Sequence, residues 1–290
     1  MADSEEPKKS SKLHSDHHEF VVSFLNIRRM IGILGIALPI VCLIINYIFL
    51  TGDVLKNSYF VHTQWSDEYQ PSIAFKPSIS DYYYTPASVL FTGTLITISI
   101  FLFCFHEKKD NTKYDKFPYI TDNLMTNIAA VSLLFVALFP TSPKNKISDN
   151  IYNFTSSDII GSVHLFFACI FFISVSIICI VNFRRTGNSK HFGKTKSDKV
   201  YLFCGIGMLF TLLAMIVYKF LNMNKSSVVQ DDTIFILESI MLILFGTAWL
   251  TKGKVNDTTF VKKVKETKLV RRVKKRYLNR KNKNELRRKI

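Results

Sequence analysis

Six long runs of apolar residues recur along the chain, and each is bounded by polar residues. The runs cover residues 30–50, 87–105, 124–141, 161–183, 200–221 and 233–251. An α-helix needs about 20 apolar residues to cross the hydrocarbon core of a bilayer. A lipid-facing helix must also be apolar on most sides, as these runs are. The pattern therefore predicts an all-α, polytopic membrane protein with six transmembrane helices and no soluble domain.

The polar segments at the two ends of the chain set the expected domain boundaries. Residues 1–26 form a polar N-terminal segment, residues 27–253 the six-helix transmembrane domain, and residues 254–290 a basic tail. The first apolar run begins only after the polar segment, and no small-residue cleavage site follows it. We therefore expect a retained helix and not a cleaved signal peptide.

Lys and Arg residues are concentrated in alternate connections between the runs. Of the 38 Lys and Arg residues, 32 lie before the first run, in the connections 106–123 and 184–199, or after residue 251. Connections rich in Lys and Arg stay on the cytoplasmic side of a membrane. Both chain ends are therefore expected in the cytoplasm, and the long connection 51–86 on the outer side. A bacterial plasma (inner) membrane and a eukaryotic endomembrane both fit this topology.

The tail 254–290 is the main source of the net positive charge. From residue 252 onward the chain has 17 Lys and Arg residues against three acidic residues, which is +14 of the net charge of +16. Val270, Val273 and Tyr277 recur at helical spacing, which is typical of a basic amphipathic helix lying on anionic lipid. We expect membrane lipids as partners, with the tail on the anionic cytoplasmic leaflet. Nucleic acid is not expected, because the tail is tethered beside that leaflet.

Three ionisable residues stand at the expected outer ends of three different runs. Asp81 lies just before the second run, and His164 and Glu238 each lie about one helical turn inside the fourth and the sixth. A charge at the centre of a bilayer costs about 2.5 kcal/mol or more, so such residues usually face a protein interior or a cavity. We therefore predict a ligand-binding cluster of Ser80, Asp81, Tyr82, His164 and Glu238 at the outer leaflet.

We expect a non-enzymatic, lipid-associated or lipid-organising membrane protein from these residues, and two other classes of function are alternatives. A non-enzymatic, lipid-organising protein would use them to join helices by hydrogen bonds. A membrane-embedded lipid hydrolase or transferase would use Ser80, Asp81 and His164, because a histidine base activates a serine hydroxyl; Ser162 is a second candidate nucleophile. A proton-coupled or cation-coupled transporter would usually show internal repeats, which the sequence lacks. No cofactor or metal is expected, because no apolar run has the His or Cys spacing of a metal site.

Short motifs near the outer ends of the runs are shared with a known membrane family. They are Ile79-Ser80-Asp81, Pro86, His164 followed by Phe167 and Ala168, and Glu238. Together they resemble the six-helix family that contains the autophagy modulator DRAM and the GPI-anchor lipid remodelling factor; bacterial six-helix proteins of unassigned function are similar in layout. The resemblance covers about residues 24–253. It implies cytoplasmic termini, a long first outer connection and action on or near lipids, although Tyr82, Tyr83 and Tyr84 depart from the family pattern.

Single residues inside the runs predict local features of the helices. Gly32, Gly35 and Gly205 would allow neighbouring helices to approach closely. Pro39 would kink the first helix, because proline cannot donate the helical hydrogen bond. Asp122 fits the N-terminal cap of the third helix, where a carboxylate accepts from free backbone amides.

Overall fold

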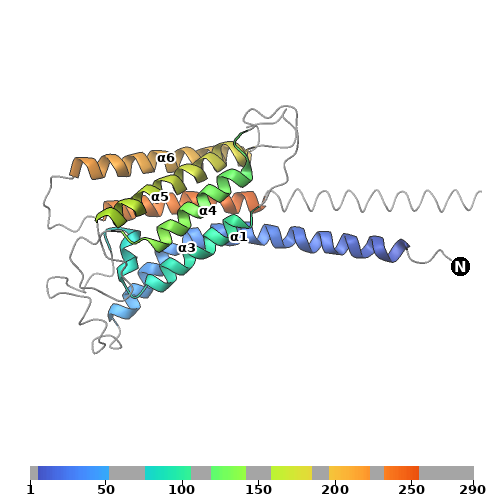
Figure 1. Ribbon diagram of the computed structural model, residues 1–290, viewed down its shortest axis with the longest axis horizontal. Helices are drawn as coiled ribbons and strands as arrows, with labels where there is room; N and C mark the ends of the chain where they lie inside the picture. The colour runs from blue at the N-terminus through green and yellow to red at the C-terminus, as the bar shows by residue number, and fades with distance from the viewer. Residues whose placement is uncertain are drawn as a thin grey trace, which may run out of the picture.

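The protein is a bundle of helices that run along one axis (Figure 1). The computed structural model describes residues 6–51, 76–105, 119–141, 158–184, 196–222 and 232–254, and these contain helices, turns and bends but no β-strand. The expected amphipathic helix of the tail lies outside the described residues. The described helices are α1 (Glu6–Thr51), the 3-10 helix η1 (Ile79–Tyr84), α3 (Ser88–Phe103), α4 (Asp122–Leu138), α5 (Asp158–Ile177), the π-helix η2 (Ile178–Asn182), α6 (Lys196–Asn222) and an unlabelled last helix (Thr233–Lys254).

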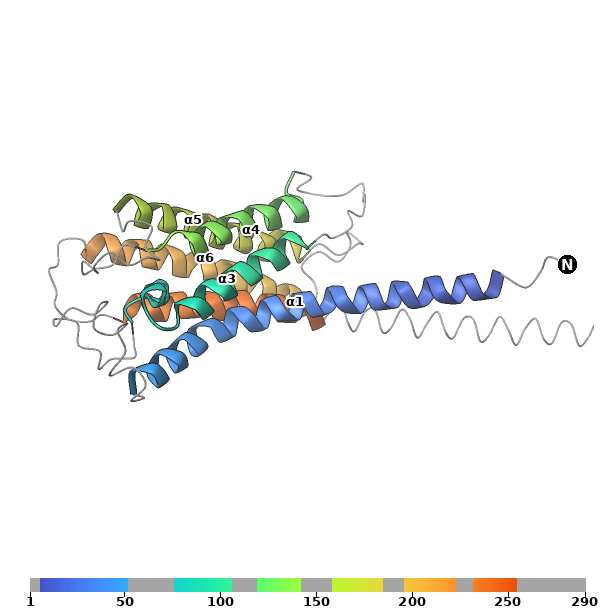
Figure 2. The same ribbon diagram turned by 60° about the horizontal axis from the view of Figure 1, so that its bottom comes forward.

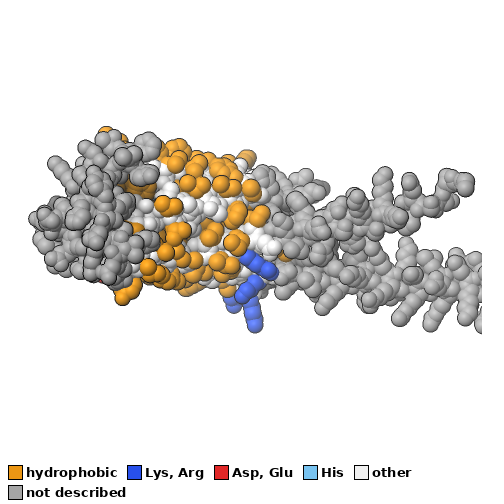
Figure 3. Space-filling model, turned by 90° about the horizontal axis from the view of Figure 1, so that it is seen from below, with side chains coloured by type: hydrophobic (Ala, Val, Ile, Leu, Met, Phe, Trp, Pro, Cys, Tyr) orange, Lys and Arg blue, Asp and Glu red, His pale blue; other side chains and the backbone are white. Residues whose placement is uncertain are grey.

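Four of these helices are long and apolar enough to cross a membrane. They contain the segments Leu25–Ile48, Ile159–Asn182, Lys196–Leu221 and Thr233–Lys254, whereas α3 and α4 are apolar but have only 16 and 17 residues. Hydrophobic side chains cover the surface between the two ends of the bundle, and Lys and Arg side chains gather at one boundary of this belt (Figure 3). The all-α prediction is confirmed for the described residues, and the four long apolar helices fit the prediction of a membrane protein.

The helices are arranged so that α1 begins, and the last helix ends, at the same end of the bundle (Figure 1). The opposite end holds η1, and we call it the η1 end. Helix α3 packs against α1 and α4, α4 also packs against α5, and α5 packs against α6. From Glu6 onward, the polar N-terminal segment and the first apolar run form one helix, α1. Helix α1 continues through Pro39 and is curved in Figure 2.

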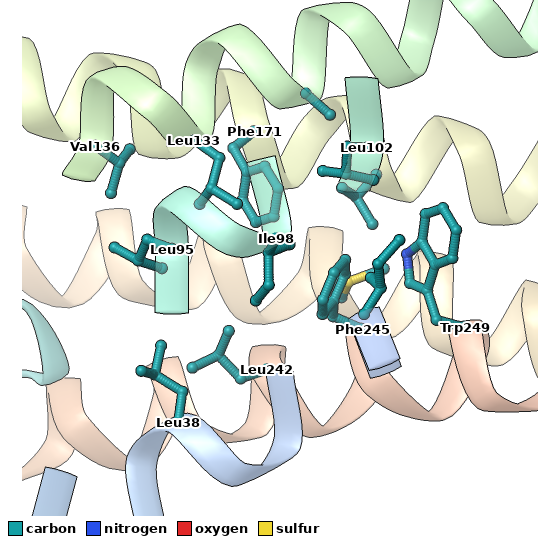
Figure 4. Close-up of a cluster of buried hydrophobic side chains, with 14 of the residues drawn as sticks. Leu38, Leu95, Ile98, Leu102, Leu133, Val136, Phe171, Leu242, Phe245 and Trp249 are labelled. Carbon is teal, nitrogen blue, oxygen red and sulfur yellow. The ribbon is translucent and has the colours of Figure 1, made fainter. Parts of the chain in front are cut away.

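The interior of the bundle is filled by side chains from α1, from α3 to α6 and from the last helix, together with residues of η1 and η2. Leu38, Leu133, Phe171 and Phe245 are among those that point toward one another in Figure 4. At the end opposite η1, the ring of Trp249 is fully buried and lies edge-on to Phe105 and to Phe183, with 5.1 Å between ring centroids in each pair. The Arg28 guanidinium lies 4.9 Å from the Phe105 ring, and the Lys252 ammonium 5.1 Å from the Phe183 ring. These aromatic and cation–π contacts close that end of the bundle.

Glycines allow the closest helix crossings in the bundle. A Cβ atom on Gly32 of α1 would lie 2.8 Å from the Gly246 carbonyl oxygen, and one on Gly246 would lie 2.5 Å from the Gly32 carbonyl oxygen. A Cβ atom on Gly205 of α6 would lie 2.5 Å from the Ile180 side chain and 3.0 Å from the Ser176 carbonyl oxygen. Side chains larger than hydrogen do not fit at these distances. The prediction of close packing at Gly32 and Gly205 is confirmed.

The start of α4 differs from the prediction that Asp122 would be its cap. Thr121 is the N-cap residue, and its hydroxyl accepts a hydrogen bond from the Leu124 amide at 3.2 Å. Asp122 is the first helical residue, and its carboxylate accepts from the Asn182 side-chain amide at 2.5 Å. Because Asp122 is already helical, the residue before it stands at the N-cap position, and Thr121 takes that place. Asp122 instead links α4 to the π-helix η2.

Candidate functional site

The 3-10 helix η1 is fixed at both of its ends by hydroxyl side chains. The Ser78 hydroxyl oxygen accepts from the Ser80 amide at 3.0 Å, as an N-cap does. At the other end the Thr85 hydroxyl donates to the Tyr82 carbonyl oxygen at 2.8 Å. A 3-10 helix has three residues per turn, so Ile79 and Tyr82 share one face, and both are buried. Ser80 is left on a different face from these two core residues.

The last helix binds η1 through Glu238 and through its own backbone. The Glu238 carboxylate accepts from the Ser78 hydroxyl at 3.0 Å and from the Ile79 amide at 2.5 Å. The Phe235 amide, in the first turn of the same helix, donates to the Pro77 carbonyl oxygen at 2.9 Å. Glu238 lies five residues after the start of its membrane segment, and His164 five residues after the start of its own. Both side chains therefore lie about 8 Å along their helices.

His164 makes a hydrogen bond with each of its ring nitrogens. Nδ1 lies 2.7 Å from the Phe139 carbonyl oxygen, and Nε2 lies 3.0 Å from the Ser80 hydroxyl oxygen. A carbonyl oxygen can only accept, so the proton of the neutral ring is assigned to Nδ1. Nε2 is then the acceptor, and the Ser80 hydroxyl donates to it. This arrangement of a serine, a histidine and an orienting oxygen is the one that activates a serine nucleophile.

Two prolines explain why backbone carbonyls are available to His164. In a continuing α-helix the Phe139 carbonyl oxygen would accept from the amide of residue 143. That residue is Pro143, which has no N–H. The Val136 carbonyl, which also interacts with the His164 ring, has Pro140 in the corresponding position. The sequence that ends α4 therefore leaves acceptors that hold the histidine ring in one orientation.

An apolar pocket begins at Ser80 and His164. Its empty volume is about 680 Å³, a figure that includes the open space at its mouth. Ser80, His164 and Glu238 supply its polar groups, and apolar residues from η1, from α1 and α3 to α6, and from the last helix supply the rest. From His164 to Phe172 the lining follows α5 for eight residues, which is about 12 Å. The pocket therefore joins a hydroxyl–imidazole pair to a long apolar cavity.

The predicted cluster separates into residues that line this pocket and residues that do not. Ser80, His164 and Glu238 line the pocket, and the η1 backbone connects them. Tyr82 is fully buried, its ring lies 6.2 Å from that of Phe235, and it is not among the lining residues. Asp81 is half-buried outside the pocket lining, and its charge acts on Lys76.

Two groups at the site were not predicted from the sequence. Ser78 links Ser80 to Glu238, and the Phe139 carbonyl oxygen orients His164. A serine just before a short helix is a typical N-cap, so Ser78 could have been found from its position. The carbonyl could have been found from the two prolines that follow it.

We expect Glu238→Ala to lower the free energy of unfolding by about 2 kcal/mol, because the half-buried Ser78 hydroxyl and the Ile79 amide would lose their acceptor. Chemical denaturation in detergent would measure this change. In a double-mutant cycle with Ser78→Ala, the two losses should add to more than the loss of the double variant. Full additivity would show that Glu238 does not hold η1 through Ser78.

Lys76 gives the protein an expected pH dependence of stability. The side chain is 3% exposed, and burial lowers its pKa to about 8, although the charge of Asp81 partly opposes the shift. In the unfolded chain the pKa is about 10.4. Between these pH values the unfolded state binds more protons, so the free energy of unfolding rises with pH. The midpoint of thermal unfolding should increase between pH 7 and pH ~9.5, and Lys76→Met should remove most of this increase.

Comparisons of the chain with protein-family models, with curated proteins and with solved structures gave no match. The resemblance to the six-helix family therefore stays a prediction. Within the described part of the chain, no group of three or more His, Cys, Asp or Glu side chains is placed to hold a metal ion.

Proposed function

We propose that the protein is a six-span membrane enzyme that transfers an acyl group from a lipid ester, with Ser80 as nucleophile and His164 as general base. The observation that carries this proposal is the hydrogen bond from the Ser80 hydroxyl to His164 Nε2, at the polar end of an apolar pocket. A lipid ester has the matching shape, because its carbonyl group adjoins an apolar chain. The pocket would hold the chain and present the carbonyl carbon to Ser80.

The proposed topology places the η1 end outside and both termini in the cytoplasm. Helix α1 enters the bundle, and the last helix ends, at the end opposite η1 (Figure 1). Helices α3 and α4 are about 24 and 26 Å long, and each packs against two neighbouring helices. They are a few ångströms shorter than the hydrocarbon core, and local thinning of the bilayer accommodates such a difference. The distribution of Lys and Arg in the sequence supports the same orientation.

The reaction proceeds in two balanced halves. The Ser80 oxygen attacks the ester carbonyl carbon while its proton moves to His164 Nε2, and the Phe139 carbonyl keeps the ring oriented through Nδ1–H. His164 then gives that proton to the leaving alcohol oxygen as the ester bond breaks, and the acyl group remains on Ser80. In the second half, water or another alcohol attacks the acyl carbon and gives its proton to His164. His164 returns the proton to Ser80 as the acyl–oxygen bond breaks.

A second function, a non-enzymatic lipid-binding or lipid-organising role, is favoured by one observation. The hydrogen bonds of Glu238 to η1 join segments that are about 160 positions apart in the sequence, as a purely structural network would. Under this alternative the pocket binds a lipid chain and the Ser80 hydroxyl only contributes a hydrogen bond. The tail 254–290 would add binding to the anionic leaflet in either case.

A product analysis distinguishes the two functions. The purified full-length chain is incubated in non-ionic detergent micelles with phosphatidylglycerol, with a diacylglycerol, and with a dialkyl ether lipid as the non-cleavable control. An enzyme should release one acyl chain from each of the two ester lipids as a free fatty acid, or transfer it to an added long-chain alcohol. It should leave the ether lipid unchanged. Binding of all three lipids with no product above the protein-free blank would favour the non-enzymatic function.

A further inference from the structure

Lys219 is an exposed cation near the η1 end of the otherwise apolar lipid-facing surface of α6. It lies within the membrane segment Lys196–Leu221, three residues before α6 ends at Asn222. Its neighbours Ile216, Val217 and Phe220 are at least 46% exposed, as expected of lipid-facing side chains. A cation at this depth usually has a function or serves as an interfacial anchor.

The position of Lys219 on α6 connects it with the pocket. Leu212 and Met215 line the pocket, and Lys219 follows them at the spacing that keeps residues on one face of a helix. It lies one turn beyond Met215, or about 6 Å closer to the end of the helix. Lys219 therefore extends the α6 wall of the pocket toward its η1 end.

The mouth of the pocket is on the same side of the bundle. The lining residues from α1, α3 and α4 are all buried, whereas Leu165 of α5 is 40% exposed. Cys169, Phe172 and Met215 are half-buried. Ser80 and Glu238 are half-buried as well, so the most exposed lining residue is Leu165 of α5, the helix that packs against α6. A lipid in the surrounding leaflet would reach the pocket from this side.

The charge of Lys219 also reaches the polar end of the pocket. The ammonium group is close enough to act electrostatically on Cys169 and His164 of α5 and on Glu238 of the last helix. These three residues all line the pocket. An anion between the mouth and Ser80 would therefore lie within the field of Lys219.

We propose that Lys219 binds the headgroup phosphate of the lipid whose acyl chain occupies the pocket, so that a phosphate-bearing lipid is the preferred substrate over a neutral glyceride. This inference rests on the proposed acyl-transfer function for its chemistry but not for its binding step. The phosphate would stand at the mouth, the ester carbonyl at Ser80, and the chain between α5 and α6. A lysine binds phosphate as a point charge, and its long side chain reaches the interface.

The test compares phosphatidylglycerol with a diacylglycerol that has the same acyl chains, both in non-ionic detergent micelles. Wild-type protein should have about tenfold higher kcat/KM for phosphatidylglycerol, the ratio that a single charge-assisted contact of about 1.4 kcal/mol provides. Lys219→Gln should remove this preference, chiefly by lowering kcat/KM for phosphatidylglycerol about tenfold. The matched control is Lys199→Gln, an exposed lysine at the other end of the same helix, which should keep the preference.

A binding measurement separates failure of this inference from failure of the proposed function. In the Ser80→Ala background, fluorescent phosphatidylglycerol should bind about tenfold more tightly than the matched diacylglycerol, and Lys219→Gln should abolish the difference. If phosphatidylglycerol binds more tightly in this way but the wild-type chain cleaves neither lipid, the proposed acyl-transfer function would be contradicted and the phosphate site supported. Equal binding of the two lipids, or a preference that survives Lys219→Gln, would overturn the inference. The inference would also be overturned if inorganic phosphate displaced the fluorescent phosphatidylglycerol as well as the unlabelled lipid does, because the ligand of Lys219 would then be a free anion.

Discussion

Ser80→Ala should lower acyl-ester turnover by about a thousandfold or more, the usual consequence of removing a nucleophile that works with a base. Alanine lacks the hydroxyl group that donates to His164 Nε2, so no acyl group can be held covalently. The backbone contacts of η1 do not use this hydroxyl, because the Ser80 amide binds Ser78. The variant should therefore fold and bind lipid. Release of fatty acid, measured by mass spectrometry, gives the rate.

Variants of a second serine and of the histidine test whether this loss is specific to the Ser80–His164 pair. Ser162, an exposed residue two positions before His164 on α5, is the other candidate nucleophile, and Ser162→Ala should keep full turnover. His164→Asn should lose about as much activity as Ser80→Ala, and the double variant should lose little more, because the two residues act as one unit. Additive losses, or an active Ser80→Ala variant that is correctly folded, would contradict the proposed roles.

Gly246→Leu should lower the free energy of unfolding by at least about 3 kcal/mol, the second large effect that we expect. A Cβ atom on this residue would already lie 2.5 Å from the Gly32 carbonyl oxygen and would overlap the Ile36 side chain. The rest of a leucine side chain would have to separate α1 from the last helix, which carries Glu238. The midpoint of thermal unfolding in detergent measures the change.

Gly93 provides the matched control for this substitution. It lies on α3, and a Cβ atom there would have nothing within 4 Å apart from its chain neighbours and the backbone of its own helix. Gly93→Leu should therefore leave stability unchanged or raise it by up to about 1 kcal/mol, because leucine favours a helix more than glycine does. Equal destabilisation by the two substitutions would indicate a general intolerance of the bundle, and the close crossing would not be its cause.

The helical architecture could be predicted from the sequence because apolar runs of this length have few alternatives. The site could be predicted only in part. The cost of burying His164 and Glu238 in apolar runs indicated that they face the protein interior, and both line the pocket. Asp81 and Tyr82 were grouped with them by sequence position alone. In the 3-10 geometry of η1, Tyr82 shares the buried face of Ile79, and Asp81 lies outside the pocket lining.

Hydrogen bonds to backbone atoms explain most of what the sequence did not reveal. The carbonyl that orients His164 belongs to Phe139, whose own side chain carries no information about this role. Likewise, Thr121 and Asp122 are both suitable caps, and the choice depends on Asn182, which lies 60 positions away. Such contacts depend on how the helices are rotated against one another, and apolar periodicity constrains that rotation only weakly.

The most direct test of the central claim is covalent labelling of Ser80 by a fluorophosphonate that carries an alkyl chain. Such a probe reacts only with a serine whose proton is removed by a base, and peptide mass spectrometry identifies the modified residue. The full-length wild-type chain should be labelled at Ser80, and labelling should be lost in His164→Asn. An unlabelled Ser80 in correctly folded protein, or equal labelling in His164→Asn, would show that the Ser80–His164 pair is not a nucleophile and its base.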